Sequence, residues 1–321
     1  MNYIDVFNGD ADGICSLVQM RNANPQNARL ITGVKRDIDL LKRIDASPDD
    51  HITVLDISYE KNSADVQRLL EQGAVIEYFD HHKSGALANH PRLKTVINDQ
   101  SSTVCTGLLV DQHLGGKFRA WALVAAFGDN LNDVAMALGK ESGFDQESLS
   151  LLQRLGIYIN YNSYGESLSD LFFHPDALFQ HLQPYATPFD FIQDNKTIFS
   201  TLEAGYKEDM ASAEASTYLY QTAESAAILF QNAQWARRVS GVYINDLANQ
   251  YPGRAHALIT ENADGTFRIS IRSPLERKGL HADELASQFV SGGGRKGAAG
   301  INALPADEFN RFVDTFKAFY A

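Results

Sequence analysis

Four clusters of acidic and histidine side chains follow short apolar segments in the N-terminal half of the chain. Two are built around aspartate, Asn-Gly-Asp-Ala-Asp-Gly at 8–13 and Gly-Asp-Asn at 128–130. The others are Asp56, which ends a Thr-Val-Leu run, and Asp-His-His at 80–82. Carboxylate oxygens and imidazole nitrogens together suit Mn²⁺, Fe²⁺ or Zn²⁺, whereas Mg²⁺ favours oxygen alone. These residue types predict a metal site, provided that the fold brings them together.

A carboxylate shared between two metal ions would explain why so many acids are present. It can hold the ions roughly 3.5–4 Å apart, where they activate water and clamp the attacking and leaving oxygens of a phosphoryl group. Each cluster alone has an ordinary alternative, because Asp-x-Asp often caps a helix and Asp-His-His often lies in a polar loop. All four in this order are hard to explain by caps and loops, so we predict hydrolysis of phosphate esters.

The elements around the clusters predict a parallel sheet with helices on both faces, because strand and helix patterns alternate. The predicted strands cover 3–7, 29–34, 52–57, 74–79 and 94–97, and the predicted helices cover 14–21, 38–44, 63–72 and 103–114. Ligands of an open parallel sheet bind beyond the carboxyl ends of its strands. The first three clusters should therefore meet at one edge, and Asp129 can join them from the end of a helix.

The rest of the chain predicts a helical region and a second, smaller α/β domain. Helices dominate 121–233, with a loop-rich stretch at 174–188 and a helix over 210–232. The smaller domain has predicted strands at 239–244, 255–261 and 266–272, a helix at 282–289, a glycine-rich segment at 291–300, and a final strand and helix, the helix at 306–320. The predicted division is 1–190, a helical connector at 191–237, and 238–321.

The glycine-rich segment is a candidate phosphate-binding loop. Its glycines Gly292, Gly293 and Gly294 allow backbone N–H groups to approach a phosphate, and Arg295 and Lys296 add positive charge. The ordinary alternative is a flexible loop that ends a helix.

Arg272 and Ser273, at the end of a predicted strand, are a second candidate contact to phosphate or base. The alternative for Arg272 is a surface arginine on an edge strand.

Composition limits the classes of function. The formal net charge of −12 argues against a protein that coats long nucleic acid, since such binding needs a basic surface. A small anionic substrate remains compatible, because a bound divalent metal makes an acidic pocket locally positive. Two cysteines cannot form a cysteine-rich zinc site. No apolar run approaches the about 20 residues of a membrane span, and no signal peptide is evident, so we expect a cytoplasmic protein without a membrane partner.

The order of the motifs resembles the DHH phosphoesterase superfamily, in its branch that carries a DHHA1 domain. The resemblance rests on Asn-Gly-Asp-Ala-Asp-Gly, Leu-Asp-Ile-Ser, Asp-His-His, Gly-Asp-Asn and the late Gly-Gly-Gly-Arg-Lys-Gly-Ala-Ala-Gly. It covers nearly the whole chain and is weakest over 135–235. It implies an N-terminal parallel-sheet DHH domain, a C-terminal α/β DHHA1 domain, and an active site in the cleft between them.

The resemblance also implies two metal ions, Mn²⁺ or another divalent cation such as Mg²⁺. Asp10 would bind one ion and Asp12 the other, and Asp56 would bridge them. His81 and Asp129 would complete the second site. Of the two remaining motif residues, His82 would lie beside the scissile phosphate and Asp80 would hold a histidine in place. By the same resemblance Arg272, Ser273 and the 292–296 segment would bind substrate.

One position departs from the family pattern. Many members have a metal-binding histidine four residues before the first Asp of Asp-x-Asp, where this chain has Val6. The first metal site is then one ligand short, and the amide oxygen of Asn8 or a water molecule is a candidate replacement. We expect weaker metal binding there. A nucleotide-binding regulator with degenerate metal sites is therefore the alternative to an enzyme.

The predicted substrate is a linear dinucleotide such as pGpG, or a very short oligoribonucleotide ("nanoRNA"), cleaved to mononucleotides. The small C-terminal domain and the acidic surface favour a short substrate. Phosphatase activity on 3′-phosphoadenosine phosphate, cyclic dinucleotide hydrolysis and pyrophosphatase activity remain alternatives. Base preference, the native metal and the oligomeric state stay open, a homodimer included.

Overall fold

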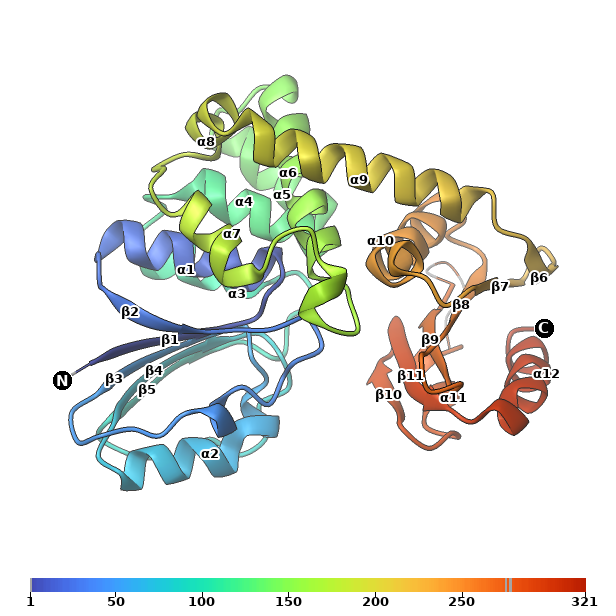
Figure 1. Ribbon diagram of the computed structural model, residues 1–321, viewed down its shortest axis with the longest axis horizontal. Helices are drawn as coiled ribbons and strands as arrows, with labels where there is room; N and C mark the ends of the chain where they lie inside the picture. Colours follow the sequence, from blue (N-terminus) through green and yellow to red (C-terminus); the bar gives the residue numbers. More distant parts are fainter. Residues whose placement is uncertain (1, 275, 277–278) are drawn as a thin grey trace. The chain divides into compact units, whose positions relative to one another are not determined.

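The computed structural model describes residues 2–274, 276 and 279–321, and it divides into two compact units, Met1–Glu203 and Ala204–Ala321. Each unit has its own sheet flanked by helices, so both are α/β as the sequence predicts (Figure 1). Across the described ranges, no helix combines the length and the apolar character that crossing a membrane requires.

The N-terminal unit contains a sheet of five parallel strands in the order β2-β1-β3-β4-β5. These strands are β1 (Tyr3–Phe7), β2 (Ala28–Ile31), β3 (His51–Leu55), β4 (Val75–Asp80) and β5 (Leu93–Ile97). Phe7 of β1 pairs with Leu55 of β3, and Leu55 pairs with Phe79 of β4. Because this register aligns the strand ends, the residues that follow β1, β3 and β4 leave the sheet at one edge.

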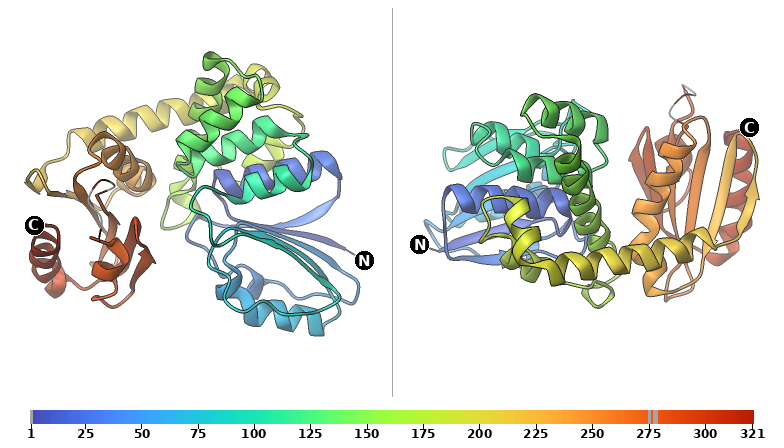
Figure 2. Two further views of the ribbon diagram at one scale, coloured as in Figure 1. Left: turned by 180° about the vertical axis from the view of Figure 1, so that it is seen from behind. Right: turned by 90° about the horizontal axis from the view of Figure 1, so that it is seen from above.

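Helices lie on both sides of this sheet (Figures 1 and 2). On one side, α2 (Tyr59–Glu71) covers a buried apolar cluster that includes Val6, Val54 and Tyr78. On the other side lie α1 (Ala11–Ala23), α3 (Thr106–His113) and α4 (Arg119–Gly128), which pack against one another. The remaining helices are α5 (Asn132–Glu141), α6 (Gln146–Ser163), α7 (Pro175–Leu182), α8 (Pro188–Asp194) and α9 (Lys196–Glu214), with 3₁₀ turns at Leu41–Arg43 and Leu168–Asp170.

The C-terminal unit contains a mixed sheet of six strands in the order β10-β11-β9-β8-β7-β6, in which only β7 and β8 pair in parallel. The strands are β6 (Tyr218–Gln221), β7 (Ser225–Phe230), β8 (Ala255–Glu261), β9 (Phe267–Arg272), β10 (Gly292–Arg295) and β11 (Ala298–Leu304). One helix, α10 (Gln234–Gln250), packs on β8 and β9. A separate apolar cluster joins the sheet to α11 (Ala282–Ala286) and α12 (Phe309–Phe319), which follows a 3₁₀ turn at Ala306–Glu308.

Two predictions around the unit boundary are wrong. The run 239–244, predicted as a strand, lies inside α10, where all six residues are buried. A short apolar run cannot be told from a buried helix by periodicity, which explains the error. The helix predicted over 210–232 ends at Glu214, and β6 and β7 follow. The segment predicted as a helical connector therefore contributes two strands to the second sheet.

Two further local predictions are wrong. The stretch 174–188, predicted as loop-rich, contains α7 and the start of α8. Pro175 and Pro188 are the first residues of these helices, where a missing N–H costs nothing, so they begin helices rather than break them. The helix predicted over 38–44 is only the 3₁₀ turn Leu41–Arg43.

Candidate metal centre

The imidazole of His81 lies among the aspartates of the other three predicted clusters. Its Nε2 atom is 3.4 Å from Oδ1 of Asp56 and 3.8 Å from an Oδ2 atom of both Asp12 and Asp129. One ligand atom from each of Asp12, His81 and Asp129 falls within 4.8 Å of the others, and the same holds for Asp56, His81 and His82. The structure therefore brings these predicted residues together from four separate stretches of chain.

Local structure positions each carboxylate. Asp10 caps α1, because its Oδ1 accepts a hydrogen bond from the N–H of Gly13 at 3.0 Å. Asp56 follows β3 with φ of 59°, in the left-handed region that non-glycine residues seldom adopt and that is frequent at functional sites. Asp129 ends α4 as its C-cap residue.

The carboxylate of Asp12 is held by the first turn of α3. The N–H of Thr106 donates to its Oδ2 at 2.8 Å, and the N–H of Gly107 donates to its Oδ1 at 2.7 Å. The Thr106 hydroxyl also donates to Oδ1 of Asp56 at 3.1 Å. A Cβ atom at position 107 would lie 2.4 Å from the Cβ of Ala125, so only glycine allows this close approach. Sequence reasoning missed Thr106 and Gly107, whose only signal is their place at a helix start.

One hydrogen bond holds the His81 ring in its orientation. Its Nδ1 atom lies 3.0 Å from the carbonyl oxygen of Val104. A carbonyl oxygen can only accept, so Nδ1 carries a proton, and Nε2 is the ring nitrogen that faces the carboxylates. Metal-binding histidines are held in the same way, with the second ring nitrogen donating to a backbone carbonyl.

Asp80 and His82 form a second pair beside this cluster. Asp80 is fully buried, and its Oδ1 accepts hydrogen bonds from the backbone N–H of His82 at 3.1 Å and from its Nδ1 at 2.7 Å. Its Oδ2 accepts from the N–H of Tyr59 at 3.1 Å. The His82 side chain is 38 % exposed. Asp80 therefore orients a histidine that solvent can reach.

The cluster around His81 is short of positive charge. Burial raises the pKa of Asp56 well above its ordinary value, and the neighbouring charges of Asp12 and Asp10 raise it further. Burial also raises the pKa of Asp12, although His81 opposes the rise. Among the described residues, the ion pairs of Asp12, Asp56 and Asp129 are to histidines alone. Buried carboxylates are normally paired or bound to metal, so this donor set fits a divalent cation such as Mn²⁺.

Asp10 is in a different situation. Its Oδ2 pairs with the ammonium of Lys35, a residue that sequence reasoning missed because no motif surrounds it. Burial alone would raise the pKa of Asp10, but Lys35 outweighs it and the pKa is lowered. Asn8, the candidate extra ligand, is also engaged: its Oδ1 accepts from the Asp10 N–H at 3.3 Å and its Nδ2 donates to the Lys35 carbonyl at 3.3 Å. Val6 is buried in the apolar cluster under α2.

The predicted glycine-rich loop is instead the strand β10, paired antiparallel with β11. Gly292 and Gly294 are required by packing, since a Cβ there would lie 1.8 Å from the Ala286 carbonyl oxygen and 2.4 Å from the Ala299 Cα respectively. Gly293 has open space around it. Three consecutive glycines have no alternating side chains, so the sequence carries no strand signal here.

The predicted substrate residues of the C-terminal unit gather around the turn between β10 and β11. Arg272 pairs with Ala298 across the sheet, and its Nε donates to Oδ1 of Asn245 at 2.8 Å. Ser273 donates from its N–H to the Gly297 carbonyl at 3.1 Å and from its hydroxyl to the Lys296 carbonyl at 2.9 Å. The side chains of Arg295 and Lys296 are exposed at this turn. Their predicted role in binding substrate stays a prediction, as does a cleft between the domains.

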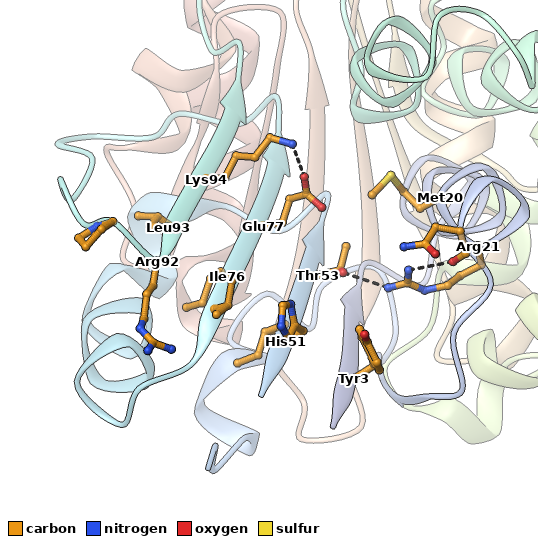
Figure 3. Close-up of a pocket in the computed structure, with 14 residues that line it drawn as sticks. Tyr3, Met20, Arg21, His51, Thr53, Ile76, Glu77, Arg92, Leu93 and Lys94 are labelled. Carbon is orange, nitrogen blue, oxygen red and sulfur yellow. Dashed lines mark hydrogen bonds and ion pairs between the residues drawn. The ribbon is translucent and has the colours of Figure 1, made fainter. Parts of the chain in front are cut away.

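The opposite, amino-terminal edge of the first sheet holds a pocket of about 310 Å³ (Figure 3). Its polar side chains already have partners. Arg21 donates to Thr53 at 3.0 Å, and Lys94 pairs with Glu77 (Figure 3). Arg21 also donates to Asp5. This pocket therefore differs from the His81 cluster, where the carboxylates outnumber their cationic partners.

Comparison with known proteins supports the resemblance seen in the motifs. Residues 198–321 match the DHHA1 domain family. Among curated proteins no relative is found.

Solved structures share the fold of nearly the whole chain. Exonuclease RecJ bound to manganese is 16% identical, with a TM-score of 0.64 over 99% of this chain and 90% of that one. The pGpG-specific phosphodiesterase PggH from Vibrio cholerae is 14% identical, with a TM-score of 0.54 over 98% and 97%. RecJ from Thermus thermophilus with Mn²⁺ is 15% identical, with a TM-score of 0.56 over 99% and 52%, so this chain spans about half of it. The predicted resemblance and fold class are confirmed. Residues 198–321, which match the DHHA1 domain, follow a parallel-sheet domain in the sequence.

Proposed function

We propose that this protein is a metal-dependent phosphodiesterase that hydrolyses linear dinucleotides or very short oligoribonucleotides to mononucleotides. The observation that carries the proposal is the convergence of Asp12, Asp56 and Asp129 on Nε2 of His81. A divalent ion bound there would supply Lewis acidity, which activates water and offsets charge on phosphoryl oxygens. Mn²⁺ is the preferred candidate because nitrogen and oxygen donors are mixed.

His82 is proposed to act on the phosphoryl group. Its Nδ1 lies 3.7 Å from Asp56, so the ring borders the cluster, yet its side chain is partly exposed. Because Nδ1 donates to the buried Asp80, that carboxylate orients the ring, and in its imidazolium form the ring can donate a proton or a hydrogen bond from Nε2 to a substrate oxygen. Asp80 is then a positioning residue, and His82 the catalytic one.

The proposed substrate class rests on three further observations. The net charge of −12 disfavours a long polyanion. The chain matches PggH over nearly the full length of both chains, and that protein is a pGpG-specific phosphodiesterase. Exposed Arg295 and Lys296 offer positive charge for the phosphates of a short substrate, and Arg272 lies on the other side of Ala298 in the same sheet. We assign these residues, Ser273 and the open backbone at Gly293 to substrate binding.

A hydrolysis panel with Mn²⁺ tests the proposal. It should compare pGpG, pApA, longer RNA, cyclic dinucleotides, 3′-phosphoadenosine phosphate and pyrophosphate, with Asp56→Asn as the inactive control. We expect linear dinucleotides to be cleaved fastest. If orthophosphate were released from pyrophosphate faster than linear dinucleotides are cleaved, pyrophosphate would be the substrate instead. Faster formation of AMP from 3′-phosphoadenosine phosphate would likewise make that compound the substrate. Binding of pGpG without turnover would identify a regulator instead.

A further inference from the structure

The ammonium of Lys35 pairs with Asp10, the carboxylate that was expected to bind one of two metal ions. Lys35 follows β2, which pairs in parallel with β1, so it leaves the sheet at the same edge as Asp10. Its backbone is fixed on both sides: its N–H donates to the Ser163 carbonyl at 2.9 Å, and its carbonyl accepts from Asn8. The position of this side chain is therefore set by the fold.

Three groups surround the Lys35 Nζ atom. It pairs with Oδ2 of Asp10, donates to Oδ1 of the buried Asn160 at 3.0 Å, and lies 5.5 Å from the ring centre of Tyr164. An ammonium has three donors and also binds the face of an aromatic ring. This set of partners suits a lysine. A divalent metal would gain nothing from the ring.

The other potential ligands of a second ion are few. The remaining oxygen of Asp10 accepts the N–H of Gly13 at 3.0 Å, and the amide oxygen of Asn8 accepts the N–H of Asp10. Position 6 carries valine, buried in an apolar cluster. With the Lys35 ammonium on Oδ2 of Asp10 and an apolar residue at position 6, this part of the site does not fit a second metal, whereas the residues around His81 fit one.

We propose that the protein binds a single divalent ion through the His81 cluster, and that Lys35 supplies the fixed positive charge that a second ion would otherwise supply at Asp10. The inference deepens the proposed function and rests on it for its catalytic meaning, but the number of ions is measurable without activity. It replaces the two-ion arrangement predicted from the sequence.

The test counts Mn²⁺ ions by elemental analysis of dialysed protein and records the electron paramagnetic resonance spectrum. We expect about one ion per chain and the spectrum of an isolated Mn²⁺ in the unmodified protein. Asp10→Asn should keep that ion, and Asp129→Asn should lose it. Lys35→Met should open Asp10 to a second, weaker ion. Lys35→Arg should not, because it keeps the charge.

Two control variants separate binding from folding. Lys94→Met removes a lysine–carboxylate pair from the opposite edge of the same sheet (Figure 3) and should leave the ion count unchanged. The double variant Asp10→Asn, Lys35→Met removes both buried partners together, which avoids an unpaired charge, and should retain about one ion.

The outcomes distinguish this inference from the proposed function. About two ions per chain, or an exchange-coupled spectrum in the unmodified protein, would overturn the single-ion inference and leave the phosphodiesterase proposal standing. No bound ion at all would overturn both. One ion in the unmodified protein and still only one in Lys35→Met would show that Lys35 is not what keeps the second ion out.

Discussion

The Nε2 atom of His81 lies 3.4 Å from Oδ1 of Asp56, although the two residues follow different strands of the sheet. Neither side chain has a fully cationic partner among the described residues, and both are buried. A carboxylate oxygen and an imidazole nitrogen held this close together can bind one metal ion. Five expectations follow from this centre and from the fold that holds it.

Replacing His81 by glutamine should remove most of the activity. Loss of a residue that only supports a metal ligand costs about 10–100-fold, so loss of a ligand should cost more than about 100-fold in kcat/KM. Bound Mn²⁺ should fall in parallel, measured by elemental analysis. His113→Gln changes a histidine outside the cluster and is the matched control. Full activity in His81→Gln would contradict the assignment.

Asp80→Asn should separate positioning from metal binding. The asparagine cannot accept the His82 Nδ1–H as strongly as a carboxylate does, so the proton donor is misaligned. We expect kcat to fall by about 10²–10⁴-fold, the usual contribution of general acid catalysis, with the Mn²⁺ content unchanged. Loss of metal together with activity would instead make Asp80 part of the metal site.

Stability should depend on pH in opposite ways with and without metal. The pKa values of Asp56 and Asp12 are raised in the folded protein above the ordinary 3.8. Between 3.8 and the raised values the unfolded chain binds fewer protons than the folded one, so the free energy of unfolding falls as the pH rises through this window. Asp10, whose pKa is lowered, contributes stability that is lost below its ordinary pKa.

Bound Mn²⁺ requires ionised carboxylates, so the increase in Tm that it causes should grow as the pH rises. Thermal unfolding between about pH 5 and pH 8, with Mn²⁺ or with a chelator, measures both trends. Asp56→Asn should flatten the metal-free curve. A Mn²⁺ effect that does not change with pH would count against these carboxylates as ligands.

Arg295→Ala should weaken substrate binding more than turnover. A charged hydrogen bond to phosphate contributes about 1.5–3 kcal/mol, so KM for pGpG should rise about 10–100-fold while kcat changes less. Arg311→Ala removes an exposed arginine paired with Glu308 and should leave KM as it is. Unchanged kinetics in Arg295→Ala would remove this residue from the proposed binding surface.

Arg21→Leu should destabilise the N-terminal unit without touching the metal centre. Arg21 donates from Nε to Asp5 at 2.8 Å and from Nη2 to Thr53 at 3.0 Å, and Asp5 is buried. Removing one partner of a buried ion pair costs about 3–5 kcal/mol, since the other charge is left unpaired. Urea unfolding measures the loss, and Asp5→Asn combined with Arg21→Leu should recover part of it. The Mn²⁺ count should stay the same in both variants.

The sequence predicts an element well where its local residue pattern matches the way the element packs in the folded protein. Tyr3–Phe7 and His51–Leu55 are apolar strands of a parallel sheet, and the acids that follow them meet because parallel strands share one carboxyl edge. The run 239–244 has the composition of a strand but is a buried helical segment, because α10 packs on the second sheet. Burial on all sides removes the periodicity on which such a prediction depends.

The metal centre, too, could be predicted only in part from local sequence. Asp12, Asp56, His81 and Asp129 could be named from their motifs, and the structure brings them together. The roles of Thr106 and Lys35 could not be predicted, since a hydroxyl at a helix start and a lysine in a loop are common everywhere. Only the parallel pairing of β1 with β2 brings Lys35 to Asp10.

Anomalous diffraction from a crystal grown with Mn²⁺, recorded near the manganese absorption edge, tests the central claim most directly. We predict a strong peak in contact with His81 Nε2 and with carboxylate oxygens from among Asp12, Asp56 and Asp129, and none at Asp10, where Lys35 should remain. A map without a peak at His81, or with its manganese bound elsewhere on the chain, would contradict both the metal centre and the hydrolysis built on it.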